Sequence, residues 1–310
     1  ASNLILNGGT LQYNNATTTN TDRLFSVGTA GGTISLPVAG TLNFTNTGSI
    51  GFNGQTGART LTFAFSNSTF GGIISLASGI GDNGGATSVV KSSTLGTLRL
   101  TSDNNTYTGT TTINGGSVSI GAIGGSTGSI GTGDIIINSG TLFVTRSGSV
   151  ILAQTISGAG GVTSNGNTML TLSGTNTYTG VTRIISNGGV VTVSNLGNGG
   201  VASSIGASSS AAGNLSITNL GTLRYVGTGA STDRLFEVPT GTPNPVATIE
   251  SSGSGALVFT NTGAMGFGSS TGARTLVLGG TNTQNNTMNP IIGDNSGATA
   301  LTKAGTGTWV

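Results

Sequence analysis

Apolar residues occur along this chain in short runs of three to five positions, and Gly, Asn, Ser and Thr separate the runs. Apolar and polar residues alternate around these runs, which is the two-residue period of a strand with one buried face. No stretch long enough to form a stable helix carries a convincing amphipathic pattern. The segment 203–212 is the least strand-like, and we expect a short helical turn or a loop there. The pattern predicts an all-β protein of many short strands joined by tight turns.

A long internal repeat organises these runs, because residues 1–99 return as residues 212–310 with a period of about 211. The clearest recurring segments are Thr21–Val27 with Thr232–Val238, and Thr56–Leu61 with Thr271–Leu276. The offset drifts by a few residues along the repeat, as small insertions in turns would produce. A chain that repeats in this way is typical of architectures that build length from stacked units.

A shorter motif occurs at residues 100–120 and again at 172–193. It has the form Leu-x-Gly-x-Asn-Thr-Tyr-Thr-Gly-x-Thr-x-Ile followed by Gly-Gly-x-Val-x-Val, and the match is closest in the second copy. The motif residues are Asn105, Tyr107, Gly109, Asn176, Tyr178 and Gly180. This string resembles the autotransporter-associated β-strand repeat.

The resemblance implies a right-handed parallel β-helix that forms the passenger region of a bacterial surface or secreted protein. It also implies an extracellular or cell-surface location after export across an outer membrane. The physics of stacked strands agrees, because one coil cannot bury its own apolar face and gains stability only from its neighbours. At ~20–24 residues per coil, the chain would form one continuous solenoid over residues 1–310 with roughly 13–15 coils.

Neither end of the chain shows a polar cap, a proline-rich stop or a cluster of charges. An uncapped β-solenoid exposes a sheet edge, which favours growth or aggregation. We therefore expect these residues to be about one and a half periods of a longer repetitive polypeptide. End-to-end stacking of protomers is the alternative, but the phase of the repeat disfavours it, because Val310 should be followed by an equivalent of Leu100.

Composition excludes several classes of function. The chain has 6% charged residues, a formal net charge of +2, no Cys and no His, so disulfides, metal–thiolate sites and cysteine nucleophiles are ruled out. Its ten basic residues are spread singly, whereas a nucleic-acid partner requires a clustered basic stripe. No apolar run approaches the ~18 residues of a membrane-spanning helix, so we expect no membrane insertion of this segment.

Two acid–base pairs recur with the long period and are candidates for binding an acidic or sugar ligand. They are Asp22 with Arg23, and Asp233 with Arg234. A repeated turn is the favoured interpretation, in which the Asp carboxylate accepts backbone N–H groups and the Arg side chain extends over a neighbouring coil. On this interpretation these four residues are structural.

The recurring pairs Asp82-Asn83 and Asp294-Asn295 offer oxygen ligands of the kind that Ca²⁺ prefers. They lack the Gly-Gly-x-Gly-x-Asp nonapeptide of calcium-binding rolls. We therefore favour turn chemistry for Asp82 and Asp294 and expect no cofactor. Tyr107 and Tyr178 are candidates for stacking on sugars, but their fixed place in the motif favours a structural role.

Three functions are compatible with these observations. The leading hypothesis is a structural extracellular module, part of a long surface fibre or adhesin stalk that provides reach, stiffness and contact between cells. The second is an adhesin module that binds glycans of a host or neighbouring cell, or other copies of itself. The third is a β-helix polysaccharide lyase or hydrolase, which we do not expect. A glycosidase needs two carboxylates at a set separation, and half of the eight acidic residues recur as parts of the building block.

Overall fold

The computed structural model of the chain describes residues 3–66, 71–185, 187–240 and 245–310. The chain divides into two compact units. Unit 1 comprises residues 1–146 and 158–160, and unit 2 comprises residues 147–157 and 161–310. The prediction of one uninterrupted solenoid over the whole chain stays a prediction, and each unit is described by itself.

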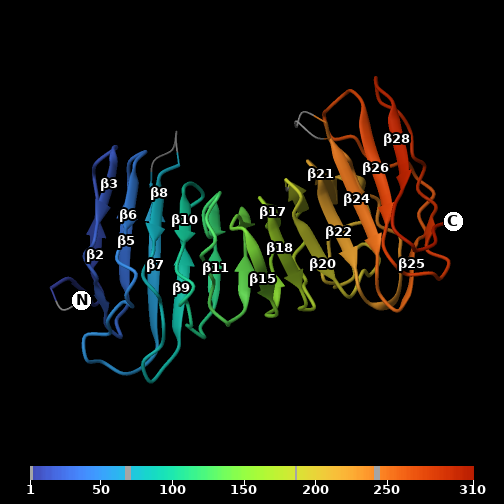
Figure 1. Cartoon of the computed structure of the whole chain (residues 1–310). Helices are drawn as coiled ribbons and strands as arrows, with labels where there is room; N and C mark the ends of the chain where they lie inside the picture. The colour runs from blue at the N-terminus through green and yellow to red at the C-terminus, as the bar shows by residue number, and fades with distance from the viewer. Residues whose placement is uncertain (1–2, 67–70, 186, 241–244) are drawn as a thin grey trace. The chain divides into compact units, whose positions relative to one another are not determined.

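Unit 1 is built of short parallel strands stacked one coil upon the next (Figure 1). One sheet has the order β3-β6-β8-β10-β12-β14, a second has the order β2-β5-β7-β9-β11-β13, and β1 pairs with β4. The strands are β1 (Ile5–Leu6), β2 (Thr10–Gln12), β3 (Thr18–Thr21), β4 (Ser26–Val27), β5 (Gly32–Leu36), β6 (Thr41–Phe44), β7 (Arg59–Phe65), β8 (Ile73–Leu76), β9 (Thr87–Lys91), β10 (Thr97–Leu100), β11 (Thr111–Ile113), β12 (Ser117–Ile120), β13 (Ile135–Ile137) and β14 (Thr141–Val144).

Unit 2 repeats this construction. A seven-stranded parallel sheet has the order β15-β18-β20-β22-β24-β26-β28, and two three-stranded groups have the orders β17-β19-β21 and β23-β25-β27 (Figure 1). The strands are β15 (Gly148–Leu152), β16 (Ile156–Ser157), β17 (Gly161–Asn165), β18 (Thr168–Leu172), β19 (Thr182–Ile185), β20 (Val190–Val193), β21 (Leu215–Thr218), β22 (Gly221–Tyr225), β23 (Thr228–Thr232), β24 (Val246–Ser251), β25 (Gly255–Phe259), β26 (Arg274–Gly279), β27 (Thr287–Met288) and β28 (Thr299–Lys303).

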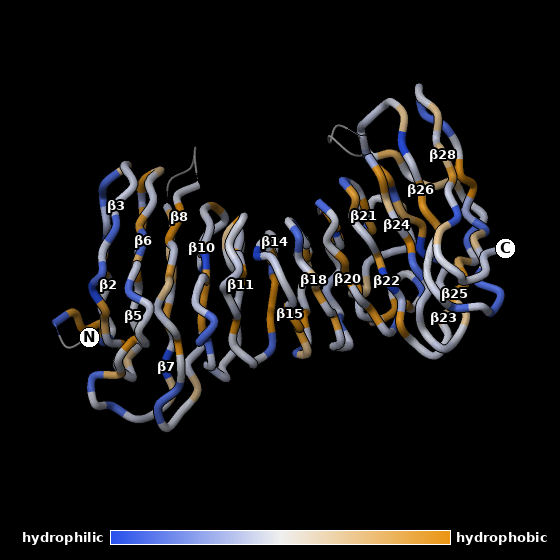
Figure 2. Tube along the Cα trace, viewed as in Figure 1, coloured by the Kyte–Doolittle hydropathy of each residue, from blue (hydrophilic) through white to orange (hydrophobic). Residues whose placement is uncertain are grey.

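Many strands contain hydrophobic residues among hydrophilic ones (Figure 2), and in strands such as β5 and β7 burial alternates from residue to residue. In β5, Ile34 and Leu36 are buried while Thr33 and Ser35 are partly exposed. The register of the strands then places apolar side chains of one coil over apolar side chains of the next, since Ile34 pairs with Phe63 of β7. Because side chains of a strand point alternately to its two faces, this register forms an apolar column that continues as far as Lys91 of β9. The all-β parallel solenoid predicted from the sequence is confirmed.

The aromatic pairs follow the long repeat. Phe25 contacts Phe44 edge to face with ring centroids 5.3 Å apart in unit 1. Phe236 and Phe259, the equivalent residues of unit 2, are 5.9 Å apart in the same geometry. All four rings are buried, so the two copies of the repeat share one core design.

Coils are longer and more variable than the sequence motif suggests. Thr97 pairs with Ser117 after a short coil, whereas Thr41 pairs with Ile73 after a much longer stretch of chain. The described residues therefore form about 12 turns, slightly fewer than expected, because some coils are longer than the motif spacing. Within the described residues the helical content is one 3-10 turn, η1 (Ala212–Asn214), at the end of the segment expected to hold a turn or loop.

Candidate functional site

Several of the polar residues that the sequence marks as candidates are buried and hold neighbouring coils together. Asn105 is buried, and its Oδ1 accepts the N–H of Ile80 at 3.0 Å while its Nδ2 donates to the carbonyl of Ser129 at 2.9 Å. These partners lie on the preceding and the following coil. The amide therefore bridges three coils through backbone groups that would otherwise be buried without partners.

Asn176 plays the same role in unit 2. Its Oδ1 accepts the N–H of Ile156 at 2.9 Å, and its Nδ2 donates to the carbonyl of Ser204 at 2.7 Å. A third bridging amide belongs to Asn286, which accepts from the N–H of Leu257 and donates to the carbonyl of Thr308. Sequence reasoning missed Asn286 because Met288 stands where the motif has Tyr, although the Asn-Thr signal was present.

The motif tyrosines are fully buried. The hydroxyl of Tyr107 lies 2.8 Å from the hydroxyl of Thr111, and that of Tyr178 lies 2.7 Å from the hydroxyl of Thr182. Burial raises the pKa of Tyr107 to about 12 and raises the pKa of Tyr178 as well. Neither ring is available to stack on a sugar.

The motif glycines follow their tyrosines by two positions. A Cβ on Gly109 would lie 2.4 Å from the carbonyl oxygen of Thr87, so the close approach of two coils requires glycine there. Gly180 lies in the bend between Tyr178 and β19.

The two Asp-Arg pairs lie in different environments. Arg234 is 2% exposed, its Nη1 donates to the Ser208 hydroxyl at 2.8 Å, and its Nε donates to the carbonyl of Gly197 at 3.0 Å. Burial lowers the pKa of this guanidinium. Arg23 and Asp22 are exposed. The sequence predicts an Arg side chain that extends over a neighbouring coil. In unit 2 the loop before β21 encloses the Arg234 side chain instead.

The Asp residues of these pairs also differ. Asp233 Oδ1 accepts the N–H of Gly199 at 2.7 Å, which is the turn role expected for the carboxylate. In both copies an Asn side chain donates to the Asp carbonyl, Asn46 to Asp22 at 2.9 Å and Asn261 to Asp233 at 2.8 Å. The hydrogen bond from the asparagine is therefore common to both copies of the turn, a contribution that sequence reasoning missed.

Asp82 and Asp294 occupy equivalent turns. Asp82 Oδ1 accepts the N–H of Thr87 at 2.6 Å, and Asp294 Oδ1 accepts that of Thr299 at 2.7 Å. Burial acts to raise the pKa of Asp82, but the hydrogen bonds from Thr108 and Thr87 together lower it. In the described part of the chain no group of three or more acidic side chains is placed to hold a metal ion.

Two further basic side chains are buried in equivalent positions of the repeat. Arg59 lies over the ring of Phe52 and donates to the carbonyl of Val27 at 2.6 Å. Arg274 lies over Phe267 and donates to the carbonyl of Val238 at 2.7 Å. Each guanidinium thus combines a cation–π contact with backbone carbonyls, and neither is free for a ligand.

Lys91 interrupts an apolar column, because its register places it between Phe63 and Ile113. Its amine donates to the carbonyls of Ser93 and Gly115 and lies 4.5 Å from the ring centre of Phe65. Burial lowers the pKa of this amine to about 8.

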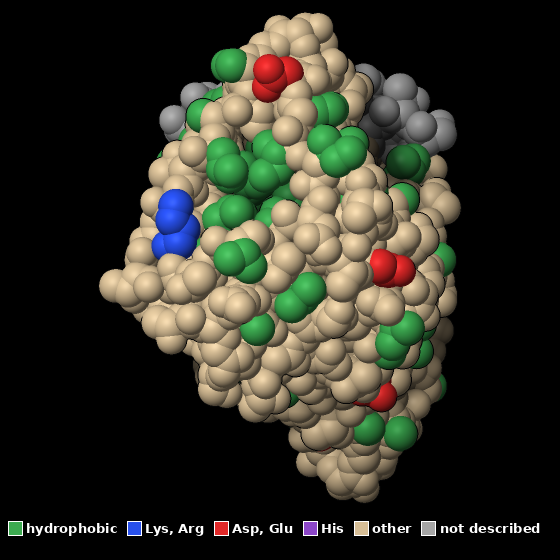
Figure 3. All heavy atoms as spheres, turned by 90° about the vertical axis from the view of Figure 1, so that its right-hand side faces the viewer, with side chains coloured by type: hydrophobic (Ala, Val, Ile, Leu, Met, Phe, Trp, Pro, Cys, Tyr) green, Lys and Arg blue, Asp and Glu red, His purple; other side chains and the backbone are tan. Residues whose placement is uncertain are grey.

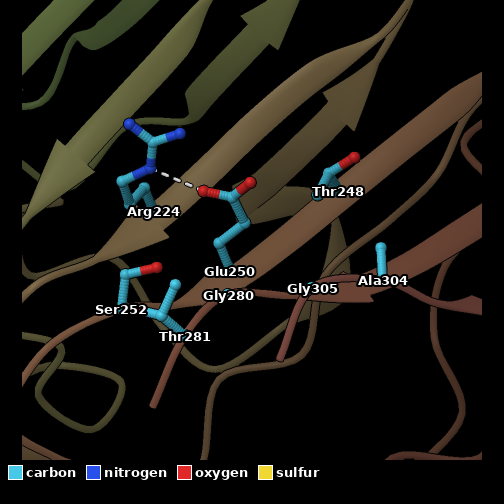
Figure 4. A pocket seen from close by; sticks show the side chains of 9 residues that line it. Arg224, Thr248, Glu250, Ser252, Gly280, Thr281, Ala304 and Gly305 are labelled. Atoms are coloured by element: carbon cyan, nitrogen blue, oxygen red, sulfur yellow. Dashed lines mark hydrogen bonds and ion pairs between the residues drawn. The ribbon is translucent and has the colours of Figure 1, made fainter. Parts of the chain in front are cut away.

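Among the hollows on the surface of the described residues, three are shallow and open to solvent. Two occupy equivalent places in the repeat, one beside Ala58 and Ala86 in unit 1 and the other beside Ala273 and Ala298 in unit 2. The third measures about 410 Å³ and is the one with an ion pair in its wall, Arg224 with Glu250 (Figure 4). Glu250 is the single carboxylate among its lining residues, whereas glycosidase chemistry requires two.

The parallel stacked strands and the side chains that bridge neighbouring coils define a β-solenoid built from sequence repeats. The Passenger-associated-transport-repeat family matches residues 90–120 and 162–193, so the resemblance seen in the sequence is confirmed. The chain is 39% identical over 326 aligned residues to the Adhesin BmaC autotransporter of Brucella suis biovar 1 (strain 1330). The match covers 85% of this chain and 9% of that relative. No solved structure matches the chain.

Proposed function

We propose that this chain is a passenger module of a bacterial surface adhesin, exported to the cell exterior, whose main task is reach and stiffness. One observation carries the proposal. The buried basic and amide side chains of the repeat bind backbone carbonyls and N–H groups of neighbouring coils, as Arg59, Arg274, Asn105 and Asn176 do. Side chains used in this way hold a stack together, and they are withdrawn from any external chemistry.

The outer surface supports contact rather than catalysis. Figure 3 shows one face of the molecule, on which charged side chains are few and scattered among polar and hydrophobic ones. Ser, Thr and Asn supply many hydroxyl and amide groups along the chain, which holds only 6% charged residues. Glycans or other copies of the same chain are the partners that this chemistry suits, because both present uncharged donors and acceptors. No helix within the described ranges is long and apolar enough to cross a membrane.

The name of the relative supports the adhesin assignment, since that protein is an autotransporter adhesin. The hollow with an ion pair gives no support to a polysaccharide-active enzyme, because its lining offers a single carboxylate. We therefore propose a non-enzymatic module with no cofactor.

The test is a deletion of one period in a cell-surface display of the chain. Removing residues 12–223 joins Leu11 to Arg224, and the repeat stays in phase because Leu11 is equivalent to the deleted Leu223. A stalk should project less far in electron micrographs and should still support adhesion. Loss of adhesion by a shortened chain that remains folded would overturn the stalk in favour of a binding site within the deleted residues.

A further inference from the structure

A column of three residues on the outer face of the seven-stranded sheet of unit 2 stands apart from its surroundings. Register pairs Arg224 of β22 with Glu250 of β24, and Glu250 with Gly279 of β26. The Arg224 Nε lies 2.5 Å from Glu250 Oε2, and both side chains remain accessible, with 40% and 23% of their surfaces exposed. In unit 2, within the described residues, this is the one ion pair.

The column forms one wall of the hollow of about 410 Å³ (Figure 4). Thr248, Ser252 and Thr281 add hydroxyl groups around it, with Thr248 on one side of Glu250 and the other two on the opposite side. The hollow exists because four of its lining residues have little or no side chain. These residues are Gly279, Gly280, Ala304 and Gly305.

Unit 1 shows that the fold does not need this arrangement. The long repeat aligns Arg224 with Gln12, Glu250 with Ser35 and Gly279 with Ala64. Gln12 pairs with Ser35, and Ser35 with Ala64, in the same parallel register. An exposed ion pair contributes only about 0–1 kcal/mol to stability. The same strands therefore assemble with an uncharged column, and the charged pair beside glycine needs another explanation.

The free atoms of the pair define the ligand. Among the described residues no partner is found for the two terminal nitrogens of Arg224 or for Oε1 of Glu250. The hollow thus presents donors beside an acceptor, with no net charge. Two adjacent hydroxyls of a sugar match this set, because each hydroxyl donates and accepts at once. An anionic ligand is disfavoured, since the carboxylate of Glu250 lies in the same wall.

We propose that this hollow is a binding subsite for a neutral saccharide, with Arg224 and Glu250 holding two adjacent hydroxyls of one ring. The inference rests on the proposed surface function only for the source of the sugar, a glycan on a neighbouring cell. Gly279 is a specificity element, because a side chain at this position would occupy part of the hollow. A Cβ there would already lie 3.3 Å from Glu250 Cγ.

The test uses saturation-transfer NMR on the full chain with the methyl glycosides of mannose, galactose and glucose, and with methyl glucuronide. The variant R224Q/E250S/G279A installs the residues of unit 1, so it should fold. Gln12→Ala, in the equivalent column, is the matched control. We expect at least one neutral glycoside to bind the native chain and the control equally, and to bind the triple variant about ten-fold more weakly.

Three results would overturn the subsite: no neutral glycoside binds, the glucuronide binds more tightly than all of them, or the triple variant binds as well as the native chain. The period deletion tests a different claim, because it retains Arg224, Glu250 and Gly279. If the deletion experiment contradicts the stalk hypothesis, the saccharide subsite is unaffected. If the NMR experiment contradicts the subsite, the stalk hypothesis is unaffected.

Discussion

Single residues of this protein carry titratable groups into its core, and their pKa values set how stability depends on alkaline pH. The Lys91 amine has a pKa of about 8 when folded and 10.5 when exposed. Between these values the unfolded chain binds more protons, so stability rises with pH. The hydroxyl of Tyr107 has the opposite effect above pH 10, because its pKa rises from 10.0 to about 12 on folding.

We therefore expect the free energy of unfolding to increase by about 1 kcal/mol from pH 8 to pH 10, after allowance for solvent screening, and to fall above pH 10. Urea unfolding followed by circular dichroism at each pH measures this. Lys91→Met should remove the rise, and Tyr107→Phe should weaken the fall. A Lys91→Met profile that still rises by the same amount would contradict the assignment.

The bridging amides make a second prediction at this scale. Asn105→Ala leaves the N–H of Ile80 and the carbonyl of Ser129 without partners, and we expect a loss of about 2 kcal/mol. Asn104 is exposed, so Asn104→Ala is the matched control and should change stability little. Equal urea midpoints for the two variants would show that the bridge carries no net energy.

At the scale of the secondary-structure elements, strand packing depends on how closely successive coils approach each other. Gly109 precedes β11, and a Cβ on it would lie 2.4 Å from the carbonyl oxygen of Thr87, the first residue of β9. Gly109→Ala should therefore push the two strands apart and cost about 1–3 kcal/mol. Gly9 lies before β2, has no heavy atom near a Cβ position, and serves as the control. Thermal unfolding of both variants measures the difference, and a Gly109→Ala protein as stable as Gly9→Ala would show that the coils separate freely.

The alternation of residues was sufficient to predict the class of these elements, because a strand with one buried face has a two-residue period that survives in any context. Coil lengths could not be predicted in the same way. The stretch between Thr41 and Ile73 is longer than the motif spacing, and no local signal distinguishes an extended loop from a further coil.

The roles of individual side chains were harder to predict where their hydrogen-bond partners lie far away in the sequence. Asp22-Arg23 and Asp233-Arg234 are identical dipeptides, yet Arg234 alone is enclosed, by carbonyls of Gly197 and Gly206 and the hydroxyl of Ser208. The loop that covers it lies well upstream, before β21. The hollow at Arg224 was missed for the same reason, because only the register reveals that Glu250 and Gly279 share its column.

At the scale of the whole molecule, stability comes from stacked apolar columns and backbone hydrogen bonds, with little contribution from charge. Two ion pairs formed by described residues, Asp103 with Arg146 and Arg224 with Glu250, are both partly exposed. Each ion pair contributes about 0–1 kcal/mol to the free energy of unfolding, and only this contribution is screened by salt. We therefore expect the free energy of unfolding to change by less than about 1 kcal/mol between low and high sodium chloride, measured by urea titration. The variant R224Q/E250S/G279A should show the same weak dependence as the native chain, because its stack of coils is intact. A loss of several kcal/mol in salt would mean that surface charges hold the coils together, and the stacking account would then be wrong.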